Sequence, residues 1–490
     1  MATPTRRLLT PVLEFLRTEA AGGVALVVAV VVALAWANGP WSHSYDALWH
    51  FEVSLGTPRS SIDQTLQHWV NDGLMVVFFF VVGLEIKREL VHGELRDPRT
   101  AAVPAIAALG GMVVPALIFA AWTAGGSGGH GWGVPMATDI ALVVGVLAIL
   151  GRHAPANLRV FLLTLAIVDD VGAIVVIAVF YASAISWTWL AGAVAGLCVI
   201  ALMRTRVRAP IAYVPFAIGV WVAMVNSGVH ATIAGVALGL LTPAGADHEH
   251  DVLERLETRL HPWTSFLVVP LFALANAGIA LDAHAVRASL THGVGLGVLT
   301  GLVLGKPIGI VGATFLAVGC GLRLPRGVGR AHVVGAGGLA GIGFTVSLFV
   351  AELAFEGSAL LADAKIAIFA ASCVAAVAGS AVLLLVRSPP MRVAALVGDL
   401  MDRSRLEEAV PGASFVRTPD GCAGADVVVV DLARHADSLT AVREIVPAAR
   451  IVGFVPHVDE DTARRAVDDG ADLVLPRSRF FHDPARAIEP

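Results

Sequence analysis

The sequence predicts an all-α polytopic membrane protein of about 12 transmembrane helices, with inverted repeats and two interrupted helices, followed by a small flavodoxin-like α/β domain. Hydrophobic residues occupy 56% of the 490 positions and charged residues only 15%, with a mean hydropathy of +0.76. Soluble domains carry about 25% charged residues. Residues 1–390 hold 22 basic and 22 acidic side chains, whereas residues 391–490 hold 12 and 17. We therefore expect a membrane domain at 1–388 and a cytoplasmic domain at 391–490.

Twelve apolar stretches approach the length of a membrane span, for which a straight helix needs about 20 residues. They lie near residues 19–38, 69–86, 101–124, 132–150, 157–182, 187–203, 209–226, 228–242, 262–281, 292–320, 331–354 and 364–387. The first stretch follows three arginines and ends in Ala35-Trp36-Ala37, a pattern that a cleaved signal peptide also shows. We expect it to be retained, because the charge alternation of the later loops requires it.

Basic residues gather in every second loop. Omitting Lys306, one set of loops holds 17 Lys and Arg before residue 387, among them the segments 87–99 and 204–208. The other set holds only 3, namely Arg59, Arg287 and Lys365. The positive-inside rule therefore places both termini in the cytoplasm. Neither part of the chain is strongly basic, so we expect membrane lipid and no nucleic acid as a partner.

Two adjacent carboxylates, Asp169 and Asp170, lie in the middle of an apolar run, residues 160–180. A charge at the centre of a membrane costs on the order of 3 kcal/mol. Neighbouring residues on a helix point about 100° apart, so one carboxylate can line a water-filled cavity while the other reaches a partner on another helix. Such groups usually mark ion or proton paths, and a structural polar pair is the alternative.

The candidate partner of this pair is Lys306, which lies in the apolar stretch 292–320. The chain contains 31 Arg and 3 Lys, so a lysine here is not its default cation. A buried ammonium group can lose its proton, whereas a guanidinium group effectively cannot. Lys306 therefore suits a titrating role in transport or, alternatively, simple charge compensation.

Two spans contain residues that interrupt helices. Asp139 follows a stretch with Gly and Pro in the fourth span, and the eleventh span holds four glycines that include Gly341 and Gly343. Interrupted helices at membrane depth are tolerated where the backbone is buried in protein or lines a cavity, and corresponding places in two halves are typical of inverted-repeat transporters. Because half-helix ends carry partial charges, we expect Asp139 to balance the positive ends and Lys306 the negative ones.

Over about residues 10–388 the chain resembles the NhaA family of sodium/proton antiporters. The motifs occur in the family's order and spacing: VNDGLMVVFFFVVGLEIKREL, ATDIA, AIVDDVGAI, SGVHATIAG, LHPW, PLFALANAG, GKPIGI and GIGFTVS. The resemblance implies a secondary transporter, not an enzyme, that exchanges cytoplasmic Na+ or Li+ for external H+ electrogenically and under pH control. It also implies a bacterial plasma (inner) membrane, no cofactor beyond the transported ions, and a homodimer, because Trp41 to Ile62 matches the family's dimer-forming hairpin.

The resemblance also implies roles for individual residues. Asp170 corresponds to the principal Na+-binding carboxylate, with Asp169 beside it as a gate and as the partner of Lys306. Thr138 and Asp139 correspond to residues where the interrupted helices cross. Asp72 matches a buried carboxylate of the second span. A cation funnel and pH-sensing region is implied for Glu85, Lys87, Arg88 and Glu89, for which solvated charges at the membrane edge are the alternative, and for Glu257 and His261. His230 matches a family position linked to pH response, with a satisfied structural histidine as the alternative.

We expect Na+ and protons to compete for Asp169 and Asp170, with the occupied site exposed alternately to each side of the membrane. Either a titrating Lys306 or a second carboxylate accounts for an electrogenic exchange. An intramembrane aspartyl protease is a poor alternative, because its aspartates lie on separate helices, typically in a GxGD motif, and residues 1–390 contain no Gly-Asp pair. A sensor that signals through the C-terminal domain without transport is the third class of function.

Residues 391–490 alternate strand-like apolar runs with polar helical ones, which predicts a small parallel α/β sheet. This domain resembles a response-regulator receiver, with Asp431 ending the third strand as a possible phospho-acceptor and Asp399 near the first acidic position. Arg477 stands where receivers have Lys. We therefore favour a degenerate receiver or a plain flavodoxin-like binding module over a phosphorylated switch.

Overall fold

The computed structural model describes the chain outside residues 1–3, 58–59, 127, 183, 204–209, 245–251, 282–285, 288, 292, 326, 387–391, 448, 457–459 and 489–490. The chain divides into two compact units, one of Pro11–Val386 and one of Arg387–Pro490 with Met1–Thr10. The basic loop 204–208 and the boundary expected between 388 and 391 lie outside the described residues.

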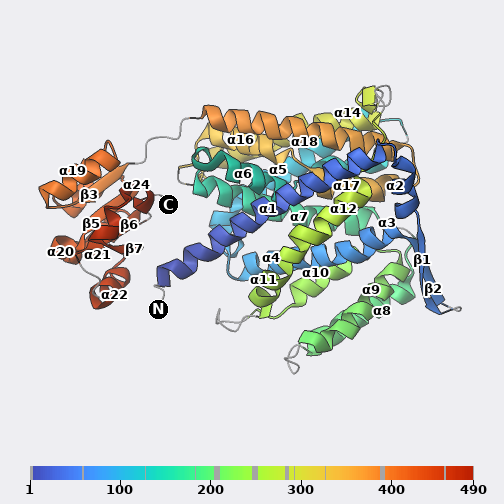
Figure 1. Cartoon of the computed structure of the whole chain (residues 1–490), viewed down its shortest axis with the longest axis horizontal. Helices are drawn as coiled ribbons and strands as arrows, with labels where there is room; N and C mark the ends of the chain where they lie inside the picture. The colour runs from blue at the N-terminus through green and yellow to red at the C-terminus, as the bar shows by residue number, and fades with distance from the viewer. Residues whose placement is uncertain are drawn as a thin grey trace. The chain divides into compact units, whose positions relative to one another are not determined.

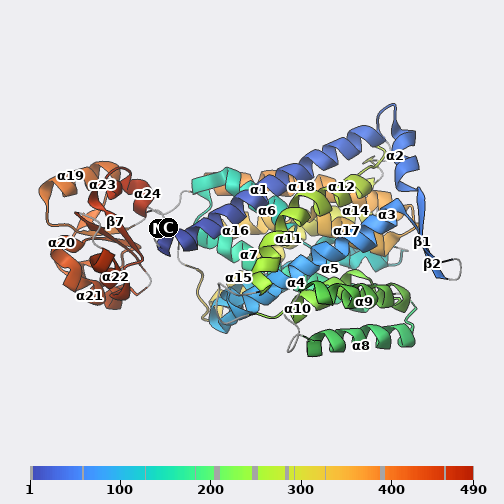
Figure 2. The same cartoon turned by 60° about the horizontal axis from the view of Figure 1, so that its bottom comes forward.

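The unit Pro11–Val386 is mainly helical (Figures 1 and 2), and its first helix begins before it, at Pro4. Its first half comprises α1 (Pro4–Ala37), α2 (Ser42–Trp49), β1 (Glu52–Thr57), β2 (Ser60–Thr65), α3 (Leu66–His68), η1 (Trp69–Leu74), α4 (Met75–Val91), η2 (Glu94–Arg96), α5 (Pro98–Thr123), η3 (Gly129–Met136), α6 (Ile140–Leu150), η4 (Gly151–His153) and α7 (Ala156–Phe180). Its second half comprises α8 (Trp187–Met203), η5 (Pro210–Tyr213), α9 (Val214–Ser227), α10 (Thr232–Leu241), α11 (Val252–Trp263), η7 (Thr264–Val268), α12 (Val269–Asn276), α14 (Gly293–Thr300), η8 (Gly301–Gly305), α15 (Lys306–Gly319), α16 (Arg330–Ala340), α17 (Phe344–Phe355) and α18 (Leu360–Leu385).

The composition of these helices is that of membrane spans. Five described helical segments are long and apolar enough to cross a membrane, and seven if each of two bent pairs counts as one span. Large apolar side chains such as Val175, Leu202 and Val377 are more than half exposed, as expected where a helix faces lipid. The polytopic helical class is therefore confirmed. The count of 12 stays a prediction, because short helices and π-helical turns divide several of the expected spans into pieces.

Helices in this unit approach one another closely at glycines. Gly110 of α5 meets Gly309 of α15, and a Cβ added to Gly309 would lie 2.1 Å from the carbonyl oxygen of Gly110. Small residues let backbones approach in this way where lipid supplies no hydrophobic drive for association. The helices α8 and α9 lie side by side at the edge of the unit (Figures 1 and 2), and share a core cluster with α10 that includes Ala193, Val220 and Ala234.

The C-terminal unit is built on a five-stranded parallel sheet with the strand order β4-β3-β5-β6-β7. The strands are β3 (Val393–Leu396), β4 (Ser414–Phe415), β5 (Val427–Asp431), β6 (Arg450–Val455) and β7 (Leu473–Pro476). Between and after them lie α19 (Leu400–Ala409), η9 (Pro419–Cys422), α20 (Leu432–His435), η10 (Ala436–Ser438), α21 (Leu439–Ile445), α22 (Glu460–Asp468), α23 (Arg477–Phe480) and α24 (Pro484–Ile488). Alternate residues of β5 enter different core clusters, Val428 in one and Val429 in the other, so both faces of the sheet are covered. The α/β sheet is thereby confirmed.

Candidate functional site

Two non-helical segments cross inside the helical unit and interrupt two spans. Residues 137–139 separate η3 from α6, and residues 341–343 separate α16 from α17, which are bent by 44° relative to each other. The N–H of Asp139 donates to the carbonyl oxygen of Ile342 (2.6 Å), and the hydroxyl of Thr138 donates to that of Ala340 (3.0 Å). The freed backbone groups of one interruption are therefore satisfied by the other, as membrane depth requires.

The glycines expected in the eleventh span lie at this crossing because there is no room for a side chain. A Cβ on Gly341 would lie 2.6 Å from the carbonyl oxygen of Leu302, and one on Gly343 would lie 2.3 Å from Oγ of Ser347 and 3.0 Å from the carbonyl oxygen of Ala137. Any larger residue at Gly343 would push the two segments apart.

The buried Asp139 serves the N-terminal ends of two half-helices. Its Oδ1 accepts from the N–H of Leu142 (3.0 Å) at the start of α6, and its Oδ2 accepts from the N–H (3.0 Å) and hydroxyl (2.6 Å) of Thr345 at the start of α17. Helix N-termini carry partial positive charge, so one carboxylate balances both. This is the arrangement expected for Asp139, with Thr345 added as a partner.

Lys306 lies at the start of α15 and is fully buried. Its Nζ lies 2.5 Å from Oδ2 of Asp169 and 2.8 Å from Oγ1 of Thr138. The contacts of this ammonium group are therefore with side chains, and the carbonyl end of α16 is reached only through the Thr138 hydroxyl, not by Lys306 directly as the sequence suggested. Oδ1 of Asp169 is buried and accepts no hydrogen bond from the described residues.

Asp170 lines a cavity that is partly open to the outside, and neither Asp169 nor Lys306 is among the residues that line it. Its polar lining comprises Glu85, Thr138, Asp139, Asp170, His261, Thr264, Ser265 and Thr345. Because Asp169 and Asp170 are neighbours on α7, their side chains diverge, one toward Lys306 and the other toward the cavity. The cavity joins the helix crossing to two residues of the charged group, Glu85 and His261.

The other members of that charged group form contacts around the end of α4. A guanidinium nitrogen of Arg88 is paired with Oε1 of Glu257, and another lies 3.5 Å from Oε1 of Glu89. Nζ of Lys87 donates to the carbonyl oxygen of Leu240 (3.1 Å). Arg88 thus links α4 to α11 beside the cavity.

Asp72 and His230 belong to a different place. They interact electrostatically with each other and with Glu356, and neither is among the residues that line the cavity. The backbone carbonyl oxygen of Asp72 accepts from the indole N–H of Trp221 (3.1 Å). The structure therefore does not bring these two residues to the helix crossing.

Sequence reasoning missed Thr345, and it placed Lys365 only as a loop charge. A hydroxyl residue directly after the Gly341 to Gly343 break was a usable signal for Thr345. Lys365 lies within α18, where its Nζ is 2.5 Å from Oε1 of Glu352. The scarcity of lysine in the chain was the signal that would have singled it out.

In the C-terminal unit, carboxylates follow two neighbouring strands of the sheet. Asp399 accepts from the N–H groups of Met401 (2.9 Å) and Asp402 (3.2 Å) and so caps α19, and Asp431 accepts from Ala433 and caps α20. Arg477 donates from Nη2 to Oδ1 of the buried Asp402 (2.7 Å). The guanidinium group of Arg477 therefore lies beside the carboxylates of Asp399 and Asp402.

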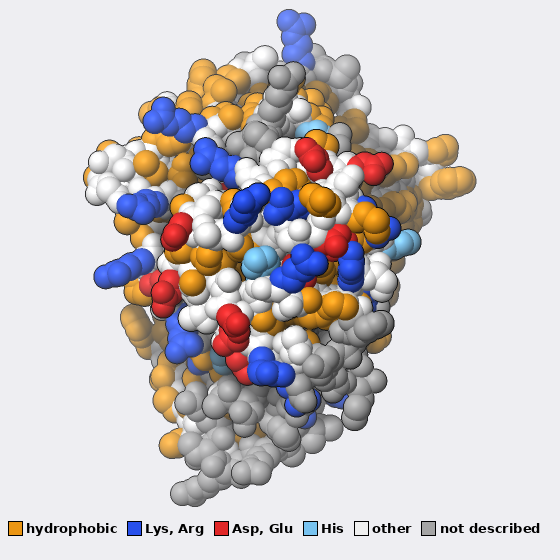
Figure 3. All heavy atoms as spheres, turned by 90° about the vertical axis from the view of Figure 1, so that its left-hand side faces the viewer, with side chains coloured by type: hydrophobic (Ala, Val, Ile, Leu, Met, Phe, Trp, Pro, Cys, Tyr) orange, Lys and Arg blue, Asp and Glu red, His pale blue; other side chains and the backbone are white. Residues whose placement is uncertain are grey.

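The two capping carboxylates differ in environment. Hydrogen bonds from backbone N–H groups, first that of Asp402, together with the charge of Arg477, lower the pKa of the partly exposed Asp399, whereas burial raises the pKa of Asp431. Among the residues that the structure describes, no group of three or more His, Cys, Asp or Glu could hold a metal ion. Basic and acidic side chains are interspersed over the face that Figure 3 presents.

A polytopic helical protein in which interrupted helices cross beside buried carboxylates and a buried lysine has the features of membrane transporters built on broken helices. The chain is a member of the Na+/H+ antiporter 1 family, whose family model matches residues 13–383. The members are transporters and not enzymes. The match ends before the C-terminal unit, for which the receiver resemblance stays a prediction.

Individual relatives agree with this assignment. The chain is 46% identical over 435 residues to "Na(+)/H(+) antiporter NhaA 2" of Sorangium cellulosum, covering 79% of this chain and 93% of the relative. It is 48% identical over 372 residues to "Na(+)/H(+) antiporter NhaA" of Acidovorax sp., covering 74% and 89%. It is 47% identical over 390 residues to the protein of that name from Streptomyces antibioticus, covering 78% and 81%. The family indicated by the sequence motifs is confirmed.

Proposed function

We propose that this chain exchanges cytoplasmic Na+, or Li+, for external H+, electrogenically and under control of pH. The observation that carries the proposal is the buried group at the helix crossing, in which Asp169 is paired with Lys306 while the adjacent Asp170 lines the cavity. Family membership supports Na+ and H+ as the exchanged ions.

The transported cation would bind to Asp170 and Asp169, with the hydroxyl of Thr138 as a further oxygen ligand. A hard cation prefers carboxylate, hydroxyl and water oxygens, and these are the groups that the crossing offers. Asp139 would hold the two half-helix ends in place around the ion, because its oxygens are already used by backbone and hydroxyl donors. A bare buried carboxylate is costly, so the site is neutralised by either Na+ or a proton, which makes the two compete.

Electrogenic exchange requires one more proton carrier than the number of Na+ ions moved. Either Lys306, whose ammonium group can lose its proton when Asp169 takes a Na+ ion, or the second carboxylate itself supplies it. Counting protons per Na+ in the Lys306→Gln variant separates the two. If the variant moves one proton fewer per Na+, Lys306 carries the extra proton. If the number of protons per Na+ is unchanged, the carboxylates carry it.

We assign pH control to the charged end of the cavity, where Glu85 and His261 line the wall and Arg88 is paired with Glu257. Lys87, Glu89 and the more distant His230 are candidate contributors. A falling cytoplasmic pH would protonate the acidic and imidazole groups and close the route to Asp170. The C-terminal unit is a candidate regulator of the same step.

We place the chain in the bacterial plasma membrane with both termini in the cytoplasm, which the alternation of 17 and 3 basic residues between loops supports. We also propose a homodimer formed through the external hairpin. The antiparallel strands β1 and β2, which pair from Glu52 opposite Thr65, support this because, among the described residues, each has an edge that pairs with no further strand.

The decisive experiment measures dissipation of a pH gradient by Na+ in everted membrane vesicles from cells that lack other antiporters. The proposal predicts dissipation by Na+ and Li+, faster at alkaline than at acidic pH and accelerated by an opposing membrane potential. A chain that is present in the membrane but gives no cation-dependent signal between pH 6 and about pH 9, a range that brackets the unperturbed His value, would disprove it.

A further inference from the structure

Two of the three lysines in the chain form buried ion pairs inside the helical unit. Besides Lys306 and Asp169, Nζ of Lys365 on α18 lies 2.5 Å from Oε1 of Glu352 on α17, with side-chain exposures of only 10% and 13%. The chain uses Arg 31 times and Lys 3 times. Lysine is therefore concentrated where a cation meets a carboxylate in the protein interior.

The second pair involves α17, the helix that begins at the crossing. Thr345 and Glu352 are seven residues apart on α17, which puts them on one face of the helix and about 10 Å apart. Thr345 donates to Asp139 at the crossing. If the crossing marks the middle of a bilayer, Glu352 lies within the half-thickness of about 15 Å.

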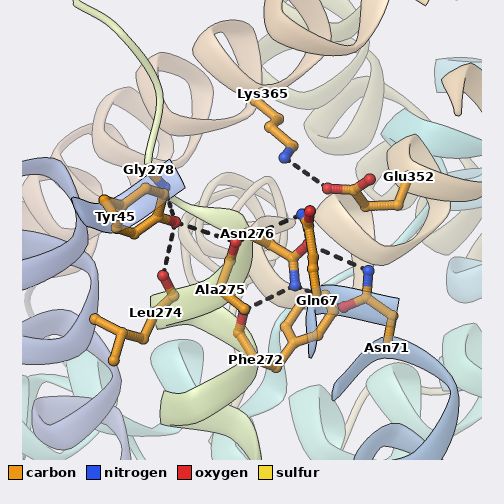
Figure 4. Close-up of polar contacts among 10 residues, drawn as sticks. All are labelled: Tyr45, Gln67, Asn71, Phe272, Leu274, Ala275, Asn276, Gly278, Glu352 and Lys365. Atoms are coloured by element: carbon orange, nitrogen blue, oxygen red, sulfur yellow. Dashed lines mark hydrogen bonds and ion pairs between the residues drawn. The ribbon is translucent and has the colours of Figure 1, made fainter. Parts of the chain in front are cut away.

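Neutral amide side chains connect the elements around this pair on the side of the β1–β2 hairpin (Figure 4). Asn276, at the end of α12, donates to Oδ1 of Asn71 (2.7 Å) and accepts from Asn71 (3.3 Å) and from Gln67 (3.0 Å). Gln67 lies in α3, two residues after the end of β2. Tyr45, which packs against the end of α12, interacts electrostatically with Glu352. Side-chain amide groups and the Tyr45 hydroxyl therefore lie around the ion pair, on the hairpin side of the helical unit.

The two ion pairs share a second property. In each, one carboxylate oxygen lies 2.5 Å from a lysine Nζ, Oδ2 of Asp169 from Lys306 and Oε1 of Glu352 from Lys365. A buried ion pair rarely stabilises a fold more than apolar side chains would. Lysine binds a carboxylate as a point charge, whereas the planar guanidinium group of arginine binds it through two N–H groups in a fixed geometry. Such a pair is suited to being opened.

We propose that Glu352 and Lys365 form a second exchangeable pair, at which Na+ displaces the Lys365 ammonium group from Glu352 on the hairpin side of the transport path. The inference rests on the proposed exchange function. In this proposal, the Lys365 ammonium group occupies the site at Glu352 between transport events. Glu352 is an ion ligand between the helix crossing and the external side of the membrane.

The test compares half-saturating Na+ on the two sides of the membrane, using right-side-out and everted vesicles of the full chain. Glu352→Gln should raise the external half-saturating concentration about tenfold, the size expected when an ion loses one charged ligand. Lys365→Met should lower it, because the competing cation is gone. Both should leave the cytoplasmic value within about twofold, which is below 0.5 kcal/mol. Glu52→Gln, which removes the same charge from the exposed hairpin strand, is the matched control and should change neither value.

Shifts of the same sign in Glu352→Gln and Lys365→Met, or equal shifts on both sides, would overturn the inference, because a structural link between α17 and α18 gives that result. Where either variant leaves too little protein in the membrane, Glu352→Met and Lys365→Gln, which also remove the charges, replace them with the same expected signs. A wild-type chain without exchange overturns the proposed function itself. Exchange with an unchanged external value in Glu352→Gln overturns only the second pair.

Discussion

The helix crossing and the edge of the C-terminal sheet both place carboxylates beside one cation, yet they differ in burial. At the crossing the side chains of Lys306 and Asp169 are 0% and 1% exposed. At the sheet edge the side chain of Arg477 is 37% exposed, and that of its partner Asp402 is 2% exposed. Both partners of a fully buried ion pair lose their hydration, which costs free energy. An ion or proton that enters the site therefore changes the free energy of the pair greatly. The guanidinium group of Arg477 is exposed enough to exchange its contacts for water instead. Under the proposed function, exchange takes place at the fully buried pair, whereas the partly exposed pair stabilises the edge of the sheet.

The choice of cation agrees with this difference. Lysine, used only three times, is at the crossing, and arginine, used 31 times, is at the sheet edge. Arginine stays protonated and binds Asp402 through two nitrogens, at 2.7 and 3.0 Å. The C-terminal cluster should therefore tolerate pH changes that alter the crossing.

The largest expected effect comes from neutralising the carboxylate that faces the cavity. Asp170→Asn should lower Na+-driven exchange by about 100-fold or more, since removing a charged ligand from an ion costs up to about 3 kcal/mol. The readout is Na+-dependent collapse of the pH gradient in everted vesicles, normalised to protein in the membrane. Asp97→Asn, an exposed loop carboxylate, is the control. Robust exchange by the Asp170 variant would remove the crossing from the transport path.

The second effect tests whether the crossing must be tight. Gly343→Ala would place a Cβ 2.3 Å from Oγ of Ser347 and 3.0 Å from the carbonyl oxygen of Ala137, so the two segments must separate. We expect a loss of exchange of at least about tenfold, which corresponds to 1.4 kcal/mol. Gly145→Ala in α6, where nothing lies within 4 Å of the added Cβ, is the matched control and should be neutral. Equal activity of the two variants would show that the crossing tolerates expansion.

The sequence predicted the crossing better than its surroundings, for physical reasons. Charges in apolar runs are costly enough to be informative singly, so Asp139, Asp169, Asp170 and Lys306 stood out. Asp72, which only the family resemblance singled out, does not line the cavity at the crossing. The pairing of Lys365 with Glu352 and the exact span count depend on helix packing and on breaks such as η7, which local patterns do not encode. In the C-terminal unit, alternating apolar runs predicted the strands, because parallel strands are buried on both faces.

A smaller effect is expected from removing the C-terminal unit. A chain that ends at residue 390 retains the whole family match of 13–383, so exchange should persist at a rate within about twofold, less than 0.5 kcal/mol. If the unit regulates transport, the pH at which exchange is half-maximal should shift. Val429→Asp, which buries a charge in the sheet, should reproduce that shift, and Val467→Asp at a half-exposed position should not. A pH profile identical to that of the full chain would contradict regulation by this unit.

The smallest effect concerns the charge on Asp431. Burial raises the pKa of this carboxyl group, so its stabilising contribution is present below the ordinary Asp value and is lost as pH rises through the raised pKa. Asp431→Asn keeps a side-chain oxygen to cap α20 but carries no charge. We therefore expect slightly greater hydrogen-exchange protection of the β5 amides of the full chain at neutral pH, by less than about tenfold, and no difference near pH 4. Arg434, at 3.9 Å, offsets part of the burial cost and keeps the gain small. Weaker protection in the variant at neutral pH would mean that this attraction outweighs burial, making the sheet edge, like the crossing, dependent on a carboxylate's charge.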